Sequence, residues 1–354
     1  MGNIKEAYDW YTKEGYLSCH QNGNLFLYNY TDKCVFQNNW NHYTKSARGL
    51  ILDQDGNVCC RVFEKFWNLN ERPETMLSAL PQETPELSDK YDGSMVSIFE
   101  NPETKKWQAV TRGCWDNIQT QFANQWLGNG NSARLEPSHT YIFELVAPWN
   151  RIVVAYSKED MILIGRTHTK GGFDFSYKDV RDYALASGLT PVYFESRPLN
   201  SLNMEDPSVV NREGFVARFS NGLRIKIKYA QYILLHRILT GLSTKGIWES
   251  LAQGNEIDLS RVPAEFLDWF KSEKCKILDA HKELERRVKE VFNGTPKFST
   301  RKEYAAAFLQ HKDIAPALFT LLDGKDCSEF LWEKVKPHGH ATFQNEGFNK
   351  GMRL

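Results

Sequence analysis

The hydrophobic period of this chain changes from two residues to about 3.6 near position 230, and this change limits the folds open to it. Before that point, short β-rich runs alternate apolar and polar residues, as half-buried strands do. After it, apolar residues recur three and four positions apart, as in amphipathic helices. We therefore expect an α+β body over residues 1–240 and an all-helical C-terminal domain over residues 241–354.

The body is expected to begin with an amphipathic helix and to contain two further helices, at residues 115–127 and 177–188. Turn residues such as Asp and Gly separate the β-rich runs. The expected strands are residues 25–30, 49–53, 58–63, 94–100, 107–113, 140–147, 151–156, 161–167, 214–219 and 223–229.

Composition is that of a globular chain, with 41% hydrophobic and 25% charged residues. The 44 basic and 44 acidic residues cancel, so attraction to nucleic acid would have to come from a local basic groove. No run approaches the ~20 apolar residues of a membrane span, so we expect no membrane association. The cysteines are scattered and form no C-x-x-C pair, which favours reduced thiols and a cytoplasmic location; they are Cys19, Cys34, Cys59, Cys60, Cys114, Cys275 and Cys327.

A lysine next to a glycine turn is the first candidate for chemistry: residues 90–94 read KYDGS, between a Pro/Glu-rich loop and an expected strand. Alone, this motif is weak, because Asp-Gly is also common in exposed turns. Its companions elsewhere in the chain make it informative.

Two lysines, Lys226 and Lys228, alternate with isoleucines in an expected strand. Residues two apart on a strand share a face, so both ammonium groups would project to the same side. Adjacent like charges reduce stability unless an anion lies between them, and a phosphate chain would serve. A solvated strand face is the alternative explanation.

Two isolated carboxylates occur in β-rich surroundings: Glu144 within an apolar strand and Glu213 at a strand entrance. A carboxylate there is costly unless hydrogen-bond donors, a cation or a metal partner it. The chain has no G-x-x-x-x-G-K-[ST] loop to hold a nucleotide. Nucleotide chemistry would therefore have to use the lysine.

This ordered set resembles the nucleotidyltransferase superfamily of polynucleotide ligases and RNA capping enzymes, whose lysine nucleophile lies in K-x-D-G. Longer phrases are similar to the bacteriophage tRNA-repair RNA ligases, over about residues 20–236. These phrases are FLYNY (26–30), ARGLI (47–51), EKFWNLNE (64–71), FELVAPWNRIVVAY (143–156) and KIKYAQYILLH (226–236). The resemblance implies an ATP-grasp-like ligase domain of antiparallel sheets with flanking helices.

The resemblance also implies roles for individual residues. Lys90 would be the nucleophile, and Glu213 would help to place magnesium, with manganese as an alternative. Arg112 stands where the family shows a lysine, and Trp67 where it shows a second phenylalanine. Contacts with ATP would come from Tyr28, Arg48, Lys65, Gly93, Glu144, Lys226, Lys228 and Tyr232.

The implied reaction is ATP-dependent joining of RNA 3′-hydroxyl and 5′-phosphate ends through a lysyl-adenylate and an RNA-adenylate. A lysine near its ordinary pKa of ~10.4 is protonated at neutral pH and cannot attack phosphorus. Cations lower a lysine pKa, and Arg48, Lys226, Lys228 and bound magnesium would supply them. The expected substrate is nicked tRNA, sealed by a monomer in the cytoplasm, which would be the host's if the protein is phage-encoded.

There are two alternatives, the first from the same superfamily and the second from a different class of protein. A DNA ligase or capping enzyme would normally follow its catalytic domain with a five-stranded barrel, whereas helices follow here. A non-catalytic RNA-binding module could keep the pocket without the activity. The basic end of the chain, which includes HGH at 338–340, is expected to help select tRNA; its histidines suit a solvated loop better than a metal site.

Overall fold

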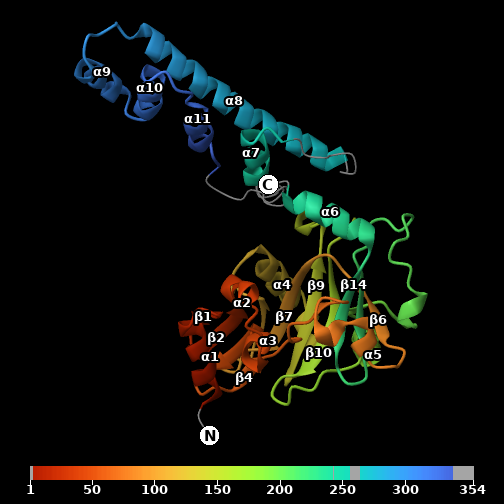
Figure 1. Cartoon of the computed structure of the whole chain (residues 1–354). Helices are drawn as coiled ribbons and strands as arrows, with labels where there is room; N and C mark the ends of the chain where they lie inside the picture. Colours follow the sequence, from red (N-terminus) through yellow and green to blue (C-terminus); the bar gives the residue numbers. More distant parts are fainter. Residues whose placement is uncertain (1–2, 242, 256–263, 338–354) are drawn as a thin grey trace. The chain divides into compact units, whose positions relative to one another are not determined.

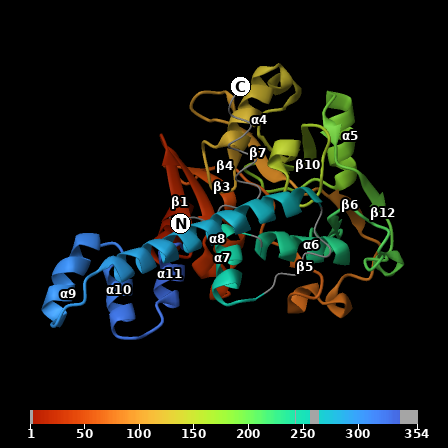
Figure 2. The same ribbon diagram turned by 90° about the horizontal axis from the view of Figure 1, so that it is seen from above.

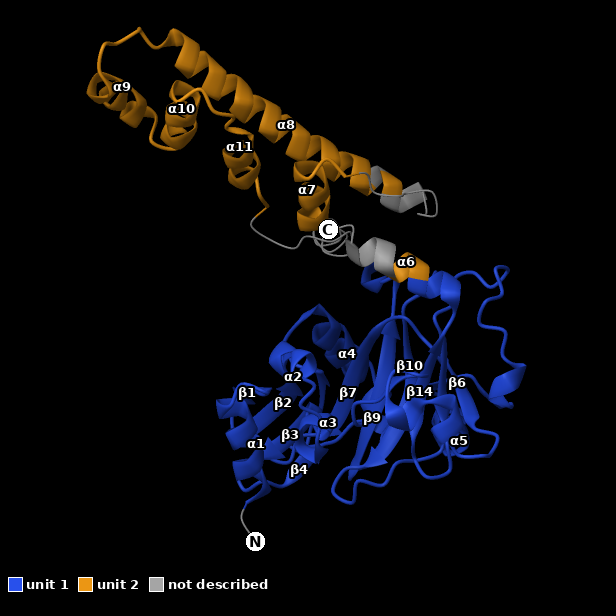
Figure 3. Cartoon of the chain, in the orientation of Figure 1, with its two compact units in different colours: residues 1–233 blue, residues 234–354 orange. Residues whose placement is uncertain are grey.

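The computed structural model describes residues 3–241, 243–255 and 264–337. The chain divides into two compact units, residues 1–233 and 234–354 (Figure 3). The first contains three sheets and the second is helical, so the predicted α+β fold with a helical C-terminal region is confirmed (Figure 1). The basic end of the chain, including residues 338–340, lies outside the described residues.

The N-terminal part is a four-stranded antiparallel sheet with three helices. Its apolar core includes Tyr8 from α1 and Tyr28 from β2, whose rings lie 5.3 Å apart. Asn3 caps α1 by accepting a hydrogen bond from the Lys5 N–H. The elements are β1 (Leu17–Asn22), β2 (Leu25–Tyr30), β3 (Arg48–Asp53), β4 (Val58–Cys60), α1 (Ile4–Lys13), α2 (Asp32–Phe36) and α3 (His42–Ser46).

A five-stranded sheet in the order β11-β10-β9-β7-β8 holds the largest core, against which α4 and α5 pack. All its strand pairs are antiparallel except β10 with β11. Its elements are β7 (Ser94–Glu100), β8 (Trp107–Thr111), β9 (His139–Val146), β10 (Asp160–His168), β11 (Thr190–Pro191), α4 (Ile118–Gly128) and α5 (Tyr177–Ser187).

The other five-stranded sheet has the order β12-β6-β13-β14-β5. Only β14 and β5 run parallel. Its strands are β5 (Trp67–Asn68), β6 (Glu86–Lys90), β12 (Phe194–Ser196), β13 (Gly214–Arg218) and β14 (Arg224–Lys228). Because β6 ends at Lys90 and β7 begins at Ser94, the KYDG turn carries the chain from one five-stranded sheet to the other.

The predicted strand at 151–156 is wrong, since these residues form an irregular loop. The N–H groups of Val153 and Val154 donate to the Asp92 carboxylate instead of to a neighbouring strand, at 2.6 and 2.8 Å. The apolar alternation of this segment therefore reflects packing around a buried carboxylate. Short 3₁₀ helices lie at Pro73–Thr75, Leu77–Ala79, Asn131–Arg134, Pro148–Asn150, Leu199–Ser201 and Leu309–His311.

The helical unit is built along one long helix, α8, with α7, α10 and α11 packed against it (Figure 2). It has two separate apolar clusters, one around Trp248 and Trp269 and one around Phe308 and Leu318. None of the helices in the described residues is long and apolar enough to span a membrane. The helices are α6 (Ala230–Gly241), α7 (Thr244–Ala252), α8 (Ala264–Gly294), α9 (Arg301–Phe308), α10 (Ala315–Leu322) and α11 (Ser328–Lys334).

Candidate active site

Lys90 lies at the end of β6, and its amine is 2.8 Å from the carboxylate of Glu213. The other oxygen of Glu213 is 2.8 Å from the amine of Lys228. Strand register explains this grouping, because Lys90 and Lys228 lie on either side of Gly214 on the central strand β13. A buried carboxylate thus lies between two lysine amines that are 138 positions apart in the sequence.

Glycine is required on both sides of this group. A Cβ on Gly93 would lie 2.3 Å from the carbonyl oxygen of Leu145, a backbone atom that cannot move aside easily. At Gly214, where φ is +146°, a Cβ would lie 2.0 Å from the carbonyl oxygen of Ile227. These close approaches hold the lysine turn against β9 and β13 against β14.

Glu144 faces the same turn from β9, where its carboxylate accepts a hydrogen bond from the Gly93 N–H at 3.2 Å. Burial raises the pKa of Glu144 to about 7, and the nearby Lys90 ammonium opposes the rise. The sequence predicts that burying the charged form of Glu144 is unfavourable, and the raised pKa agrees with this. A hydroxyl or a cation that contacts the carboxylate would reduce the penalty.

Asp92 has a positioning role that the sequence did not reveal, although it lies within the motif. Its buried carboxylate accepts hydrogen bonds from Val153 and Val154, and its Oδ1 accepts one from the Tyr232 hydroxyl at 2.7 Å. Its N–H donates to the Tyr156 hydroxyl at 2.9 Å. Asp92 therefore fixes the turn that presents Lys90.

Asn150 is a second residue that sequence reasoning missed. Its side-chain amide donates to the Leu145 carbonyl at 2.8 Å, while its oxygen accepts hydrogen bonds from Ser94 and Gln119. It thereby links the start of β7 to the end of β9. The only sequence signal was its place in the polar turn after an apolar strand.

A cavity of about 110 Å³ adjoins the turn and is lined by three cationic side chains and by the carboxylates of Asp89 and Glu144. Lys90, Lys226 and Arg48 line it together with Glu144. Burial, followed by repulsion from Arg48, Lys65, Lys90 and Lys228, lowers the pKa of Lys226 to about 7. Several cationic side chains in a small cavity suit an anionic ligand, and we call this the nucleotide cavity because phosphates fit that chemistry.

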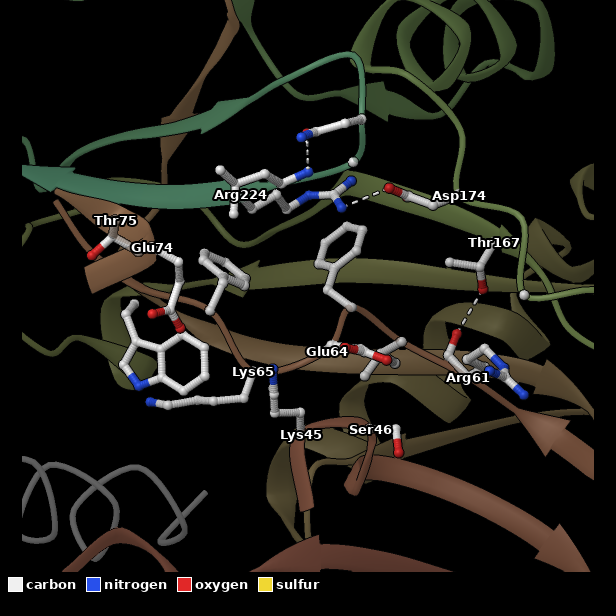
Figure 4. Close-up of a pocket in the computed structure, with 18 residues that line it drawn as sticks. Lys45, Ser46, Arg61, Glu64, Lys65, Glu74, Thr75, Thr167, Asp174 and Arg224 are labelled. Carbon is white, nitrogen blue, oxygen red and sulfur yellow. Dashed lines mark hydrogen bonds and ion pairs between the residues drawn. The ribbon is translucent and has the colours of Figure 1, made fainter. Parts of the chain in front are cut away.

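Lys65 lines a separate, larger cavity of about 360 Å³ (Figure 4). This central cavity shares Phe63 and Phe66 with the nucleotide cavity. The Phe66 ring also carries Lys226, whose amine lies 4.9 Å from the ring centroid. Lys65 therefore lines the cavity next to the one that Lys90 lines.

The two tyrosines expected to contact ATP do not line either cavity. Tyr28 is 0% exposed in the N-terminal core and donates to Asp9 at 2.6 Å. Tyr232 is buried and donates to Asp92. The structure thus places Tyr28 among core rings and Tyr232 beside a buried carboxylate, outside the lining of both cavities.

The two remaining positions flagged in the sequence lie near Lys65. Arg112 donates to the Tyr30 hydroxyl at 2.9 Å, and Trp67 is buried at the edge of the central cavity. Each keeps the charge or the ring that the resemblance implied. Neither lines the nucleotide cavity.

The site's donors fit a nucleotide better than an independent metal ion. In the described part of the chain, no three His, Cys, Asp or Glu side chains come together to hold a metal. Mg²⁺ commonly binds one or two carboxylates together with substrate phosphates and water. Glu144 and Glu213 could supply such carboxylates only with phosphate oxygens completing the shell, and Glu213 would have to loosen its contacts with the lysines.

Comparison with known proteins finds similarity in both sequence and fold. A family model described as "RNA ligase" matches residues 46–232, just over half of the chain. The RNA ligase of Rhodothermus phage RM378 is 25% identical over 332 residues, covering 72% of this chain and 73% of that protein. Two structures of an archaeal ATP-dependent RNA ligase superpose with TM-scores of 0.50 and 0.51 at 11% and 12% identity, over 91% of this chain and 96% of theirs. At such low identity, these structures establish the fold alone.

Proposed function

This chain belongs to the RNA ligase family, and we propose that it joins RNA 3′-hydroxyl and 5′-phosphate ends in an ATP-dependent reaction through an adenylate on Lys90. The observation that carries this proposal is the position of Lys90, at a glycine turn that opens on a cavity lined by Arg48 and Lys226. A nucleophilic amine beside cationic side chains that can bind an anion suits attack on a phosphate.

In the first step, the Lys90 amine attacks the α-phosphate of ATP, forming a P–N bond while the bond to pyrophosphate breaks. The ammonium must first lose a proton, and the carboxylate of Glu213, 2.8 Å away, is placed to accept it. Arg48 and Lys226 would stabilise the charge that develops on the phosphate oxygens. Magnesium, or manganese, held by Glu144 and Glu213 with phosphate oxygens, would supply further charge neutralisation.

In the second step, the 5′-phosphate of RNA attacks the lysyl-adenylate, so that the P–N bond breaks and AMP passes to the RNA. In the third step, the 3′-hydroxyl attacks the activated phosphate and AMP leaves. Arg48 and Lys226 can also serve in both later steps, because each step develops charge on phosphate oxygens next to Lys90.

The natural substrate that we propose is a tRNA broken in its anticodon loop, bound by the enzyme as a monomer. Residues 1–240 would carry the adenylyl-transfer chemistry, and residues 241–354 would select the tRNA. The helical unit has its own apolar clusters around α8, which would allow it to act as a distinct recognition domain. A preference of about tenfold in kcat/KM for nicked tRNA over unstructured RNA would support this part of the proposal; equal rates would contradict it.

The central experiment is self-adenylylation. The full-length protein is first stripped of bound AMP with pyrophosphate and then incubated with α-labelled ATP and magnesium, beside Lys90→Ala and the exposed control Lys106→Ala. We expect acid-sensitive label on the wild type and on Lys106→Ala, and none on Lys90→Ala. Absence of label from all three would overturn the ligase mechanism and leave an RNA-binding module; label on Lys90→Ala would place the nucleophile elsewhere.

Circularisation of a 5′-phosphorylated RNA, seen on a denaturing gel, tests the joining step itself. The wild type is expected to form the circle only when the RNA ends in a 3′-hydroxyl, and a blocked 3′ end should stop the reaction at the RNA-adenylate. Absence of a circle from the RNA with a free 3′-hydroxyl, in protein that labels itself with AMP, would contradict the proposed end chemistry.

A further inference from the structure

Three cations, Lys45, Lys65 and Arg72, lie within about 6 Å of the centroid of the buried Trp67 ring. The amine of Lys45 lies 5.8 Å and the guanidinium carbon of Arg72 5.2 Å from the ring centroid. Both residues line a cleft of about 160 Å³, which we call the outer cleft. Its lining includes Asn38, Trp40, Lys45, Trp67, Arg72 and Glu74.

Neither cation has an acidic partner among the residues that the structure describes, whereas many surface lysines and arginines elsewhere form ion pairs. Glu74 also lines the outer cleft, but it makes no ion pair with Lys45 or Arg72 in this part of the chain. An aromatic ring holds a cation in place without neutralising its charge. The outer cleft therefore combines two fixed positive charges with one carboxylate.

The outer cleft is the end of a row of three cavities. It shares Lys45, Trp67 and Glu74 with the central cavity, which shares Phe63 and Phe66 with the nucleotide cavity. In Figure 4, Lys45, Lys65 and Glu74 lie toward one side of the central cavity, away from Asp174 and Thr167. A chain of phosphates could thus pass from Lys90 to the outer cleft along residues of the same unit.

We propose that the outer cleft binds a backbone phosphate of the RNA strand being joined. Lys45 and Arg72 would hold this phosphate, and Trp67 would keep both cations in position. ATP is a less suitable occupant, because the outer cleft shares no lining residue with the nucleotide cavity where the α-phosphate must meet Lys90. The path of the RNA from Lys90 to the outer cleft rests on the proposed function. Binding of RNA to the outer cleft can be measured without it.

The test compares the full-length Lys45→Ala/Arg72→Ala variant with a charge-matched control, Lys13→Ala/Lys106→Ala, whose lysines are exposed and lie outside all three cavities. Binding of a short single-stranded RNA with a blocked 3′ end is followed by fluorescence anisotropy over a range of salt concentrations. We expect the cleft variant to bind at least about fivefold more weakly and its salt slope to fall by about 0.7, the contribution of one phosphate contact on a single strand. The control should change little.

Self-adenylylation of the same variants separates RNA from ATP as the occupant. The cleft variant should keep the wild-type rate, whereas Lys65→Ala should slow it. A loss of adenylylation in the cleft variant equal to that in Lys65→Ala would overturn the inference, because the cleft would then serve the triphosphate. Equal RNA affinity and salt slope in the cleft variant and the control would overturn it as well.

Two further measurements keep the result interpretable. The Lys45→Arg/Arg72→Lys variant retains both charges and should restore RNA binding; failure to do so in a protein with wild-type thermal unfolding would contradict a phosphate site. If the wild type does not self-adenylylate, the proposed function fails, while the difference in RNA affinity still decides whether the cleft binds RNA.

Discussion

The carboxylate of Glu213 lies 2.8 Å from the amine of Lys90, and it contacts Lys228 at the same distance. Only 2% of the Glu213 side chain is exposed, against 22% and 24% for the two lysines. Lys90, the proposed nucleophile, therefore lies in an ion pair with a buried carboxylate. In the proposed mechanism, adenylyl transfer exchanges this contact for one with phosphate.

Replacing this carboxylate by an amide should both destabilise the protein and slow adenylyl transfer. Glu213→Gln leaves two ammonium groups side by side, and we expect the free energy of unfolding to fall by about 1–3 kcal/mol, less than for a fully buried pair because the lysines are partly exposed. Self-adenylylation should slow at least about tenfold. Urea unfolding and labelling with ATP measure the two effects.

The control for this variant is Glu333→Gln, which removes an exposed carboxylate 3.1 Å from Lys336. It should change the free energy of unfolding by less than about 1 kcal/mol. Equal stability of the two variants would show that the Glu213 contacts do not contribute as proposed.

Binding of a polyphosphate should raise the pKa of Lys226, which is about 7 in the free protein because of burial and neighbouring cations. At about pH 8, Lys226 is mostly neutral before binding, so pyrophosphate should bind with uptake of up to about one proton, and the uptake should disappear below about pH 6. Calorimetry in buffers of different ionisation enthalpy measures it. The Lys226→Met variant should lose this uptake; the same uptake in wild type and variant would rule out Lys226 as its source.

The same shift affects folding stability. The folded pKa lies below the ordinary lysine value of 10.5, so between about pH 7 and that value the unfolded chain binds a proton that the folded chain does not. The contribution of Lys226 to stability should therefore become more favourable as pH rises through this window. In Lys226→Met, the free energy of unfolding should rise less over the same range.

Adding a methyl group at Gly93 should disrupt the nucleophile turn. The new Cβ would meet the Leu145 carbonyl at 2.3 Å, so the backbone must shift, and we expect Gly93→Ala to lower the free energy of unfolding by about 1–3 kcal/mol and to abolish most self-adenylylation. Gly128→Ala is the matched control, because a Cβ there has nothing within 4 Å. Wild-type activity in Gly93→Ala would mean that the turn tolerates a different path.

The hydrogen bonds that the buried Asp92 carboxylate accepts should contribute to the stability of the protein. Asp92→Asn replaces an oxygen that accepts buried N–H groups, and it should cost about 1–3 kcal/mol of unfolding free energy, measured by thermal or urea unfolding. Tyr232→Phe removes only one donor to the same carboxylate and should cost about 1 kcal/mol. The opposite order of the two variants would argue against Asp92 as the residue that positions the turn.

Local patterns in the sequence were sufficient for the class of fold and for part of the site. Alternation identified β14 and the shared face of Lys226 and Lys228, and the change of period marked the helical region. The lysine-glycine turn, with Glu144 and Glu213, indicated nucleotide chemistry. The resemblance to RNA ligases is confirmed by the match to the RNA ligase family. These features are readable because period two and short motifs are local properties of the chain.

Only the tertiary structure decided which neighbour covers each face. The same alternation that places Lys226 in the nucleotide cavity places Tyr28 in a closed aromatic core, because strand period specifies opposite faces but not what packs on them. Strand register, set over long sequence separations, brought Glu213 between Lys90 and Lys228. Lys45 precedes Trp67 in the sequence and Arg72 follows it. Tertiary packing brings both cations close to the same Trp67 ring.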